Sequence, residues 1–177
     1  MTGYWIFRTK AGLAGVAGTG QGIKLLLLPG RPKKKIAARI LSACPEARPG
    51  RAAPKAARDA IKTVQEYFQG SVRIRAVKLD LCGRTEFQKR VLAAARKIKP
   101  GQVRTYSWVA KKAGRPEAFR AAAQALAQNP VPLFIPCHRV IGKDGSLTGF
   151  SAPGGLKLKK LMLEIEKSRG RVSPPRT

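Results

Sequence analysis

The sequence predicts an α/β protein in which a mixed α/β amino-terminal domain is followed by a mainly helical carboxy-terminal domain. Three observations support this fold class. Glycine-broken extended segments open the chain, a basic Pro-rich stretch follows, and apolar residues at helical spacing dominate from Thr85 onward. At 177 residues with 44% hydrophobic content, the chain can form one sizeable domain or two small ones. We expect domains at 1–80 and 81–168, with a flexible tail at 169–177.

The first domain carries signals for strands, a linker and one helix. Residues 1–30 are typical of extended segments separated by glycines. Five prolines between residues 29 and 54 lie among many Lys and Arg residues, so we expect this region to be loosely built. Apolar residues at helical spacing predict a helix over 58–69, and the alternation over 72–76 predicts a half-buried strand.

The second domain begins with a helix signal at Thr85. Thr85 is followed three residues later by Gln88, which is the spacing of a capping box. The apolar stripe that follows predicts a helix that ends before Pro100-Gly101.

Two further helices are predicted to be joined by a tight turn. Ser107 is a candidate cap for a helix over 108–113, which Gly114 ends. Pro116 is placed to start the next helix, which reaches Gln128. Helix, Gly-containing turn and helix together form the helix-turn-helix outline, although the alanine-rich second helix also fits simple packing in the protein.

The charge of the chain is strongly one-sided. Thirty-six Lys and Arg residues against nine Asp and Glu residues give a formal net charge of +27. Such a balance favours nucleic acid as the partner, with an anionic membrane surface as the rival. No signal peptide or membrane span is predicted. Three scattered cysteines indicate a reducing, cytoplasmic or nucleoid-associated location, and a bridge between Cys44 and Cys82 is the alternative.

The candidate reactive residues lie in the segment Ile135-Pro136-Cys137-His138-Arg139-Val140. Cys137 follows a predicted buried strand over 131–135, where a side chain can face a cleft. A reactive thiol needs a base or a cation to form the thiolate, and His138 and Arg139 can supply that environment. Because neighbours on an extended chain face opposite ways, a turn or a bridging water is required between Cys137 and His138.

Two carboxylates on the predicted final helix, residues 156–166, are candidates to orient the imidazole, namely Glu164 and Glu166. The sequence argues against a zinc site, because the cysteines form no C-x-x-C pair and Cys137 and His138 are adjacent. We therefore expect no metal. Cys137 and His138 could also be an inert buried thiol and a core histidine, or part of a cysteine hydrolase.

Residues 79–166 resemble the active-site domain of the O6-alkylguanine-DNA alkyltransferases, the methylated-DNA–protein-cysteine methyltransferases. The resemblance covers about half the chain, and the Pro-Cys-His-Arg-Val segment preceded by Asn129-Pro130 is its most specific part. Further matching pieces are Leu79-Asp80-Leu81, Thr85-Glu86-Phe87-Gln88, Ile98-Lys99-Pro100-Gly101, Thr105-Tyr106, Arg120-Ala121 and Gly154-Gly155-Leu156.

The resemblance implies roles for several of these residues. Cys137 would accept the alkyl group, His138 would act as a base through a water, Glu166 would orient His138, and Asn129 would hold the turn that carries the cysteine. Residues implied to contact DNA are Tyr106, Ser107, Arg120, Ala121 and Arg139. The implied pocket for the flipped guanine comprises Tyr106, the carbonyls of Cys137 and Val140, Phe150, and the amide of Ser151.

The implied reaction is a single, irreversible transfer of an alkyl group from guanine O6 to Cys137, after base flipping from the minor groove. The expected partner is double-stranded DNA containing O6-alkylguanine, with no cofactor, and the chain is expected to act as a monomer. Two departures from the family pattern concern the pocket, where Phe150 replaces a common tyrosine and Ala152-Pro153 lengthens the loop. The rival functions are a basic architectural DNA-binding protein and a cysteine hydrolase.

Overall fold

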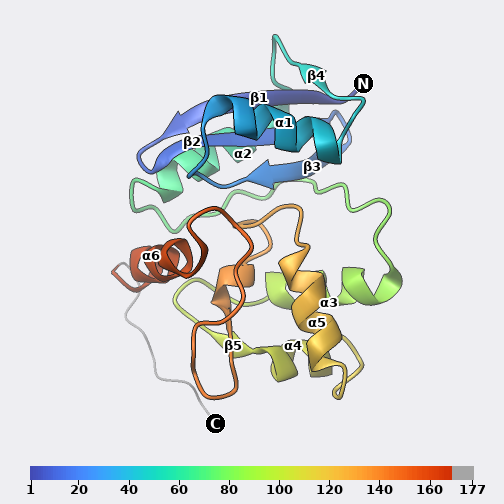
Figure 1. Ribbon diagram of the computed structural model, residues 1–177, viewed down its shortest axis with the longest axis vertical. Helices are drawn as coiled ribbons and strands as arrows, with labels where there is room; N and C mark the ends of the chain where they lie inside the picture. Colours follow the sequence, from blue (N-terminus) through green and yellow to red (C-terminus); the bar gives the residue numbers. More distant parts are fainter. Residues whose placement is uncertain (169–177) are drawn as a thin grey trace. The chain divides into compact units, whose positions relative to one another are not determined.

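The computed structural model of the chain describes residues 1–168, which divide into two compact units (Figure 1). Unit 1 comprises Met1–Cys82, and unit 2 begins at Gly83. The mixed α/β fold expected from the sequence is confirmed, with a sheet in the first unit and most of the helices in the second. The tail expected at 169–177 lies outside the described residues.

Unit 1 is built around a four-stranded sheet with strand order β3-β2-β1-β4. The first three strands are antiparallel, and β4 is parallel to β1 at the edge. Its elements are β1 (Gly3–Thr9), β2 (Gly12–Thr19), β3 (Gly22–Leu27), α1 (Lys33–Ala43), β4 (Arg48–Pro49) and α2 (Lys55–Tyr67). The glycine-broken segments predicted as extended are therefore the three long strands.

Strand β2 is buried along most of its length, because helices cover both faces of the sheet. Helix α1 packs on the face that includes Ala17, and α2 lies across the other face (Figure 1). Ile36 and Ile40 of α1 rest directly on Gly15, where an added Cβ would overlap Ile36. The lack of a side chain at Gly15 thus lets α1 approach the sheet closely.

Two local predictions for unit 1 are wrong. The Pro-rich basic stretch is not loosely built, since it contains α1, whose buried Ile36 and Ile40 outweigh the repulsion among its exposed cations. Residues 72–76 form no strand. The sheet pairing instead falls two residues later, where Ile23 donates to the Lys78 carbonyl (2.9 Å) and accepts from the Asp80 amide (2.8 Å).

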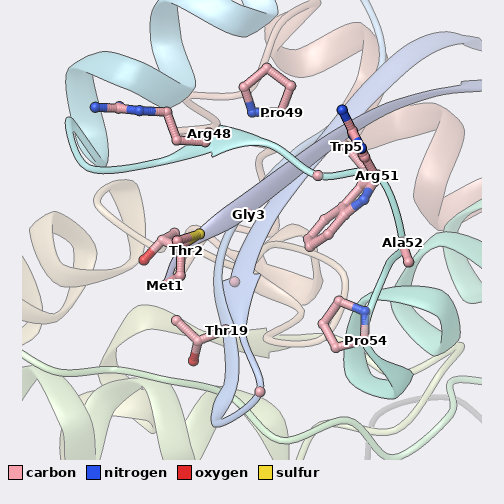
Figure 2. Close-up of a pocket in the computed structure, with 13 residues that line it drawn as sticks. Met1, Thr2, Gly3, Trp5, Thr19, Arg48, Pro49, Arg51, Ala52 and Pro54 are labelled. Atoms are coloured by element: carbon pink, nitrogen blue, oxygen red, sulfur yellow. The ribbon is translucent and has the colours of Figure 1, made fainter.

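A pocket of unit 1 lies beside the indole of Trp5 (Figure 2). Its lining includes Arg48 and Arg51, which come from β4 and the segment after it. The indole needs two glycines beside it, because a Cβ on Gly3 or Gly50 would overlap its ring atoms. The two glycines therefore leave room for the Trp5 ring.

Among its described residues, 83–168, unit 2 contains four α-helices and a pair of very short strands. Helices α3, α4 and α5 pack against one another, and β5 pairs in parallel with β6. The elements are α3 (Glu86–Arg96), β5 (Arg104–Thr105), α4 (Tyr106–Lys112), α5 (Phe119–Ala127), the 3-10 turn η1 (Cys137–Arg139), β6 (Val140–Ile141) and α6 (Gly155–Lys167).

The capping box predicted for the first helix of unit 2 is confirmed. The Gln88 amide donates to Thr85 Oγ1 (3.2 Å), and the Thr85 amide donates to Gln88 Oε1 (3.1 Å). The cap predicted for the next helix is wrong, because Thr105 Oγ1 rather than Ser107 accepts from the Trp108 amide (3.1 Å). Helix α4 begins earlier than expected because β5 already ends at Thr105.

Helix α5 begins at Phe119, three residues after the proline that was expected to start it. Pro116 lies in a turn that the Ala118 amide closes onto the Arg115 carbonyl (3.1 Å). The short connection between α4 and α5 matches the helix-turn-helix outline in order, with Gly114 in a left-handed conformation (φ +82°) where α4 ends.

Within residues 1–168, every helix is too short or too polar to cross a membrane. The three cysteines are free thiols, so Cys44 and Cys82 do not form the alternative bridge. In the same described part of the chain, no three His, Cys, Asp or Glu side chains gather in a way that could hold a metal ion.

Candidate active site around Cys137

A sequence of turns, rather than the strand expected over 131–135, delivers Cys137. Leu133 adopts a left-handed conformation (φ 76°), which reverses the chain direction. The Ile135 amide then bonds back to the Val131 carbonyl (3.0 Å). Pro136, at φ −81° and ψ 66°, has the geometry of an inverse γ-turn, closed by the Cys137 amide on the Ile135 carbonyl (2.8 Å). This path supplies the turn that the adjacent Cys137 and His138 side chains required.

The side chain of Asn129 holds this turn together. Its Nδ2 donates to the Ile135 carbonyl (2.8 Å) and to Cys137 Sγ (3.2 Å), while its Oδ1 accepts from the Val131 amide (3.0 Å). The amide group therefore fixes both ends of the turn and supplies a donor to the sulfur. A donor at this position favours the thiolate over the thiol.

His138 and Glu166 form a buried pair, and neither side chain is exposed to solvent. His138 Nε2 lies 2.8 Å from Glu166 Oε1. The rival carboxylate, Glu164, is exposed and lies 4.0 Å from Lys160. Of the two acids predicted as partners of the imidazole, Glu166 is therefore the one that reaches it.

Arg139 is not placed to contact DNA, so the expectation drawn for it is wrong. Its side chain is 4% exposed and its guanidinium binds Glu166 through Nε (2.9 Å to Oε2) and Nη2 (2.8 Å to Oε1). A third donor reaches the Ile98 carbonyl just after α3. The Gly101 amide also donates to Glu166 Oε2 (3.2 Å). Arg139 thus anchors the carboxylate that holds His138.

The protonation states follow from burial and from these contacts. Burial would raise the pKa of Glu166, but hydrogen bonds from His138 and Arg139 outweigh it and lower the pKa to about 2. Burial lowers the pKa of His138, against the pull of Glu166. An ionised Glu166 can only accept, so neutral His138 donates from Nε2 and carries its lone pair on Nδ1.

The Cys137 thiol is buried, and burial raises its pKa. The hydrogen bond from Asn129 and the charge of Lys159 act in the opposite direction. The thiol is therefore protonated at rest, and forming the nucleophile requires removal of its proton.

The residues expected to line the pocket come from several elements of unit 2. Pairing of β5 with β6 sets Thr105 opposite Ile141, which brings Tyr106, the next residue, near the loop after β6. The Tyr106 hydroxyl donates to the Thr148 carbonyl (3.2 Å). Phe150 is half-buried and Ser151 is exposed, with its Oγ donating to the Ala127 carbonyl (2.6 Å).

Three of the residues expected to contact DNA are exposed on α4 and α5. Ser107 lies in the first turn of α4, and Arg120 and Ala121 lie in the first turn of α5. The Arg120 guanidinium rests over the ring of exposed Phe119, 5.6 Å from its centroid. These side chains are accessible to a large partner.

Lys159 is the site residue that the sequence interpretation missed. It lies on α6 with no solvent exposure, and its Nζ donates to the carbonyls of Val140 and Thr148, each at 2.6 Å. The sequence does contain a signal that Lys159 is buried. Lys159, Met162, Leu163 and Glu166 recur at i, i+3, i+4 and i+7, which places the lysine on the buried face of the helix.

These features define a class of protein in which a buried cysteine is followed by a histidine that a buried glutamate holds, in a helical unit of a strongly basic chain. Residues 86–168 match the family model described as the DNA binding domain of 6-O-methylguanine DNA methyltransferase.

The chain is 44% identical to a methylated-DNA–protein-cysteine methyltransferase of Mycobacterium leprae over 109 residues, which are 62% of this chain and 64% of that relative. Identity to the protein of the same name from Methanosarcina acetivorans is 43%, over 63% of this chain and 69% of the relative. The crystal structure of Mycobacterium tuberculosis OGT in complex with DNA matches with a TM-score of 0.76 and 34% identity, over 95% of this chain and 94% of that one. The chain therefore belongs to the methylated-DNA–protein-cysteine methyltransferase family.

Proposed function

We propose that this protein repairs DNA by transferring an alkyl group, typically methyl, from O6 of guanine to Cys137 in one irreversible turnover. The observation that carries the proposal is the pair of contacts at adjacent residues, from Asn129 to Cys137 Sγ and from His138 to the buried Glu166. A cysteine placed only for packing has no need of a histidine held by a buried carboxylate beside it.

The reaction requires a thiolate and a leaving group. The thiol proton passes through a water to Nδ1 of His138, which the bond to Glu166 keeps available as the base. The sulfur attacks the alkyl carbon, the bond from carbon to O6 breaks, and its electron pair stays on the guanine. The imidazolium of His138 gives its proton back through water, and the guanine takes up one proton and becomes the normal base of the DNA again. The thioether left on Cys137 ends the activity of that molecule.

Access to O6 requires that the damaged nucleotide leave the base stack. Extrusion costs a few kcal/mol and less for a weakened pair, so damage itself assists selection. The exposed Arg120 on α5 is suited to fill the gap from the minor groove, with Tyr106, Ser107 and Ala121 beside the backbone. The carbonyls of Cys137 and Val140, with the Ser151 amide and the Phe150 ring, would hold the guanine edge.

The partner in this proposal is double-stranded DNA that contains O6-alkylguanine, bound by a monomer that needs no cofactor. The net charge of +27 suits a polyanion and gives affinity that does not depend on sequence. DNA as the substrate and three free thiols support a cytoplasmic or nucleoid-associated location.

Intact-mass measurement after incubation with an O6-methylguanine duplex tests the function. We expect one added methyl group per chain, located on Cys137 by peptide mapping. The variant Cys137→Ser should bind the duplex but gain no methyl group, because the hydroxyl is a far weaker nucleophile. No added mass on the unaltered chain would favour an architectural DNA-binding protein, and release of methanol without a lasting adduct would favour a hydrolase.

A further inference from the structure

Lys159 on α6 is buried, and burying its ammonium group destabilises the fold unless other groups compensate the charge. Removing a charge from water costs several kcal/mol when it is not compensated. Lys159 is compensated by two short, charge-assisted hydrogen bonds, both to main-chain carbonyls. Among the ion pairs of residues 1–168, none joins Lys159 to a carboxylate, and the buried Glu166 is engaged by His138 and Arg139.

The two carbonyls belong to two segments that border the reactive cysteine. Val140 directly follows the turn that carries Cys137 and His138, and it begins β6. Thr148 lies in the irregular loop between β6 and α6, where Gly149 is in the left-handed region (φ 51°). Lys159 therefore ties the loop to the cysteine turn through a single atom, Nζ.

Two further hydrogen bonds attach the loop, and one of them shares the carbonyl that Lys159 binds. The Tyr106 hydroxyl donates to the Thr148 carbonyl that Lys159 also binds, and Ser151 Oγ donates to the Ala127 carbonyl. A carbonyl oxygen has two lone pairs, so the Val140 carbonyl can accept from Lys159 and from a bound guanine together. The backbone that would recognise the base is thus arranged before the base arrives.

Resting on the alkyl-transfer function proposed above, we propose that Lys159 is a positioning residue, whose buried ammonium holds the Val140 carbonyl and the Thr148–Ser151 loop in the geometry that receives the flipped guanine.

The charge of Lys159 has a second effect, on the nucleophile. Its presence lowers the pKa of the Cys137 thiol, and burial lowers the pKa of Lys159 itself to about 8, against the influence of Cys137. The other titratable or charged groups around Cys137 and Lys159 are Tyr106, His138, Arg139 and Glu166. Loss of the ammonium should therefore make the thiolate harder to form as well as loosening the loop.

The decisive variant is Lys159→Met, which keeps the length of the side chain and removes its charge and donors. Its matched control is Lys157→Met, the same change at an exposed position of the same helix. We expect Lys159→Met to transfer methyl groups about 10- to 100-fold more slowly, because small misplacements of a reacting group cost factors of this size. The slowing should be similar for the duplex and for free O6-benzylguanine, since the loop belongs to the pocket.

Two readouts separate positioning from general stability. The pH profile of Cys137 labelling by iodoacetamide, measured without DNA, should move to higher pH in Lys159→Met and stay in place in Lys157→Met. Hydrogen exchange should quicken in residues 148–151 of Lys159→Met. DNA affinity and its salt dependence should remain unchanged, because Lys159 is buried.

The unaltered chain is the reference for both proposals. If it transfers no alkyl group, the proposed function fails, whatever Lys159 does. If it does transfer, a folded Lys159→Met that reacts at the same rate with an unmoved labelling profile overturns the role of Lys159. Should Met at this position prevent folding, Lys159→Gln, which keeps one donor group, replaces it, and unfolding of both variants would also overturn a role confined to the pocket.

Discussion

Glu166 Oε1 lies 2.8 Å from His138 Nε2 and 2.8 Å from Arg139 Nη2, so one buried carboxylate holds two adjacent residues of the cysteine turn. Glu166 comes from α6, and its other oxygen accepts from the Gly101 amide (3.2 Å). The helix, the turn and the segment after α3 are therefore joined at a single side chain. The reactive turn owes its rigidity to this junction as well as to Asn129.

Replacing Glu166 by Gln should reduce both stability and transfer rate. The change leaves the buried guanidinium of Arg139 without its counter-charge, and breaking a buried pair in this way costs about 3–5 kcal/mol. Glu164→Gln on the same helix is the control, since its carboxylate is exposed and surface changes stay within about 0.5 kcal/mol. Urea unfolding and single-turnover kinetics on both variants check this. Equal effects of the two changes would mean that Glu166 is not the junction.

The free energy of unfolding should fall in acid, and the same carboxylate should contribute to the slope. The pKa of Glu166 is about 2 in the folded chain and 4.5 ordinarily, so the unfolded chain binds the proton more tightly. Its contribution is complete above 4.5 and is lost as the pH falls toward 2. His138, whose pKa burial lowers from 6.5, adds to the loss below that value. Unfolding free energies across this range should decline less steeply in Glu166→Gln than in the unaltered chain.

Arg120→Ala should slow repair of a duplex far more than reaction with free O6-benzylguanine. An inserted side chain stabilises the extruded nucleotide only where a base stack has been broken. Arg90→Ala, which removes an exposed arginine from α3, serves as the charge control. Single-turnover rates on the two substrates give the comparison. If Arg120→Ala slows both substrates alike, Arg120 is not the residue that fills the gap.

Thr105→Ala should destabilise the chain by about 1 kcal/mol, the usual effect of losing a helix N-cap. The Thr105 hydroxyl accepts from the Trp108 amide, whereas the exposed Ser107 side chain caps nothing in α4. Ser107→Ala should therefore leave the thermal midpoint nearly unchanged and affect only DNA binding. A larger loss of stability from Ser107→Ala than from Thr105→Ala would contradict this assignment of the cap.

The alkylated protein should be less stable than the unreacted one. Cys137 is 8% exposed, and every residue from Pro130 to Val140 is buried, so an added group must displace packed neighbours. Overpacking of this kind costs about 1–3 kcal/mol, and the hydrogen bond from Asn129 to the sulfur is weakened as well. Thermal midpoints should drop after methylation and drop further after benzylation. A midpoint that holds or rises would show that the pocket accommodates the product without strain.

Local signals in the sequence were enough for the features that depend on neighbouring residues. The capping box of Thr85 and Gln88 was predictable because its two partners are three residues apart. The same holds for the glycine-broken strands of unit 1, for the final helix, and for the segment around Cys137, whose order of residues is specific. Local signals failed where they were ambiguous, as between Thr105 and Ser107, which precede the same helix.

Only the tertiary structure decided what the charged residues of the site do. Glu166 rather than Glu164 reaches His138, Arg139 turns inward to Glu166 instead of toward DNA, and Lys159 joins Val140 to Thr148. The separations of these contacts along the chain run from 11 residues, for Lys159 and Thr148, to 28 residues, for His138 and Glu166. A sequence states which charges exist, but burial determines their partners, because a charge removed from water must find a counter-charge or hydrogen bonds wherever the fold brings them.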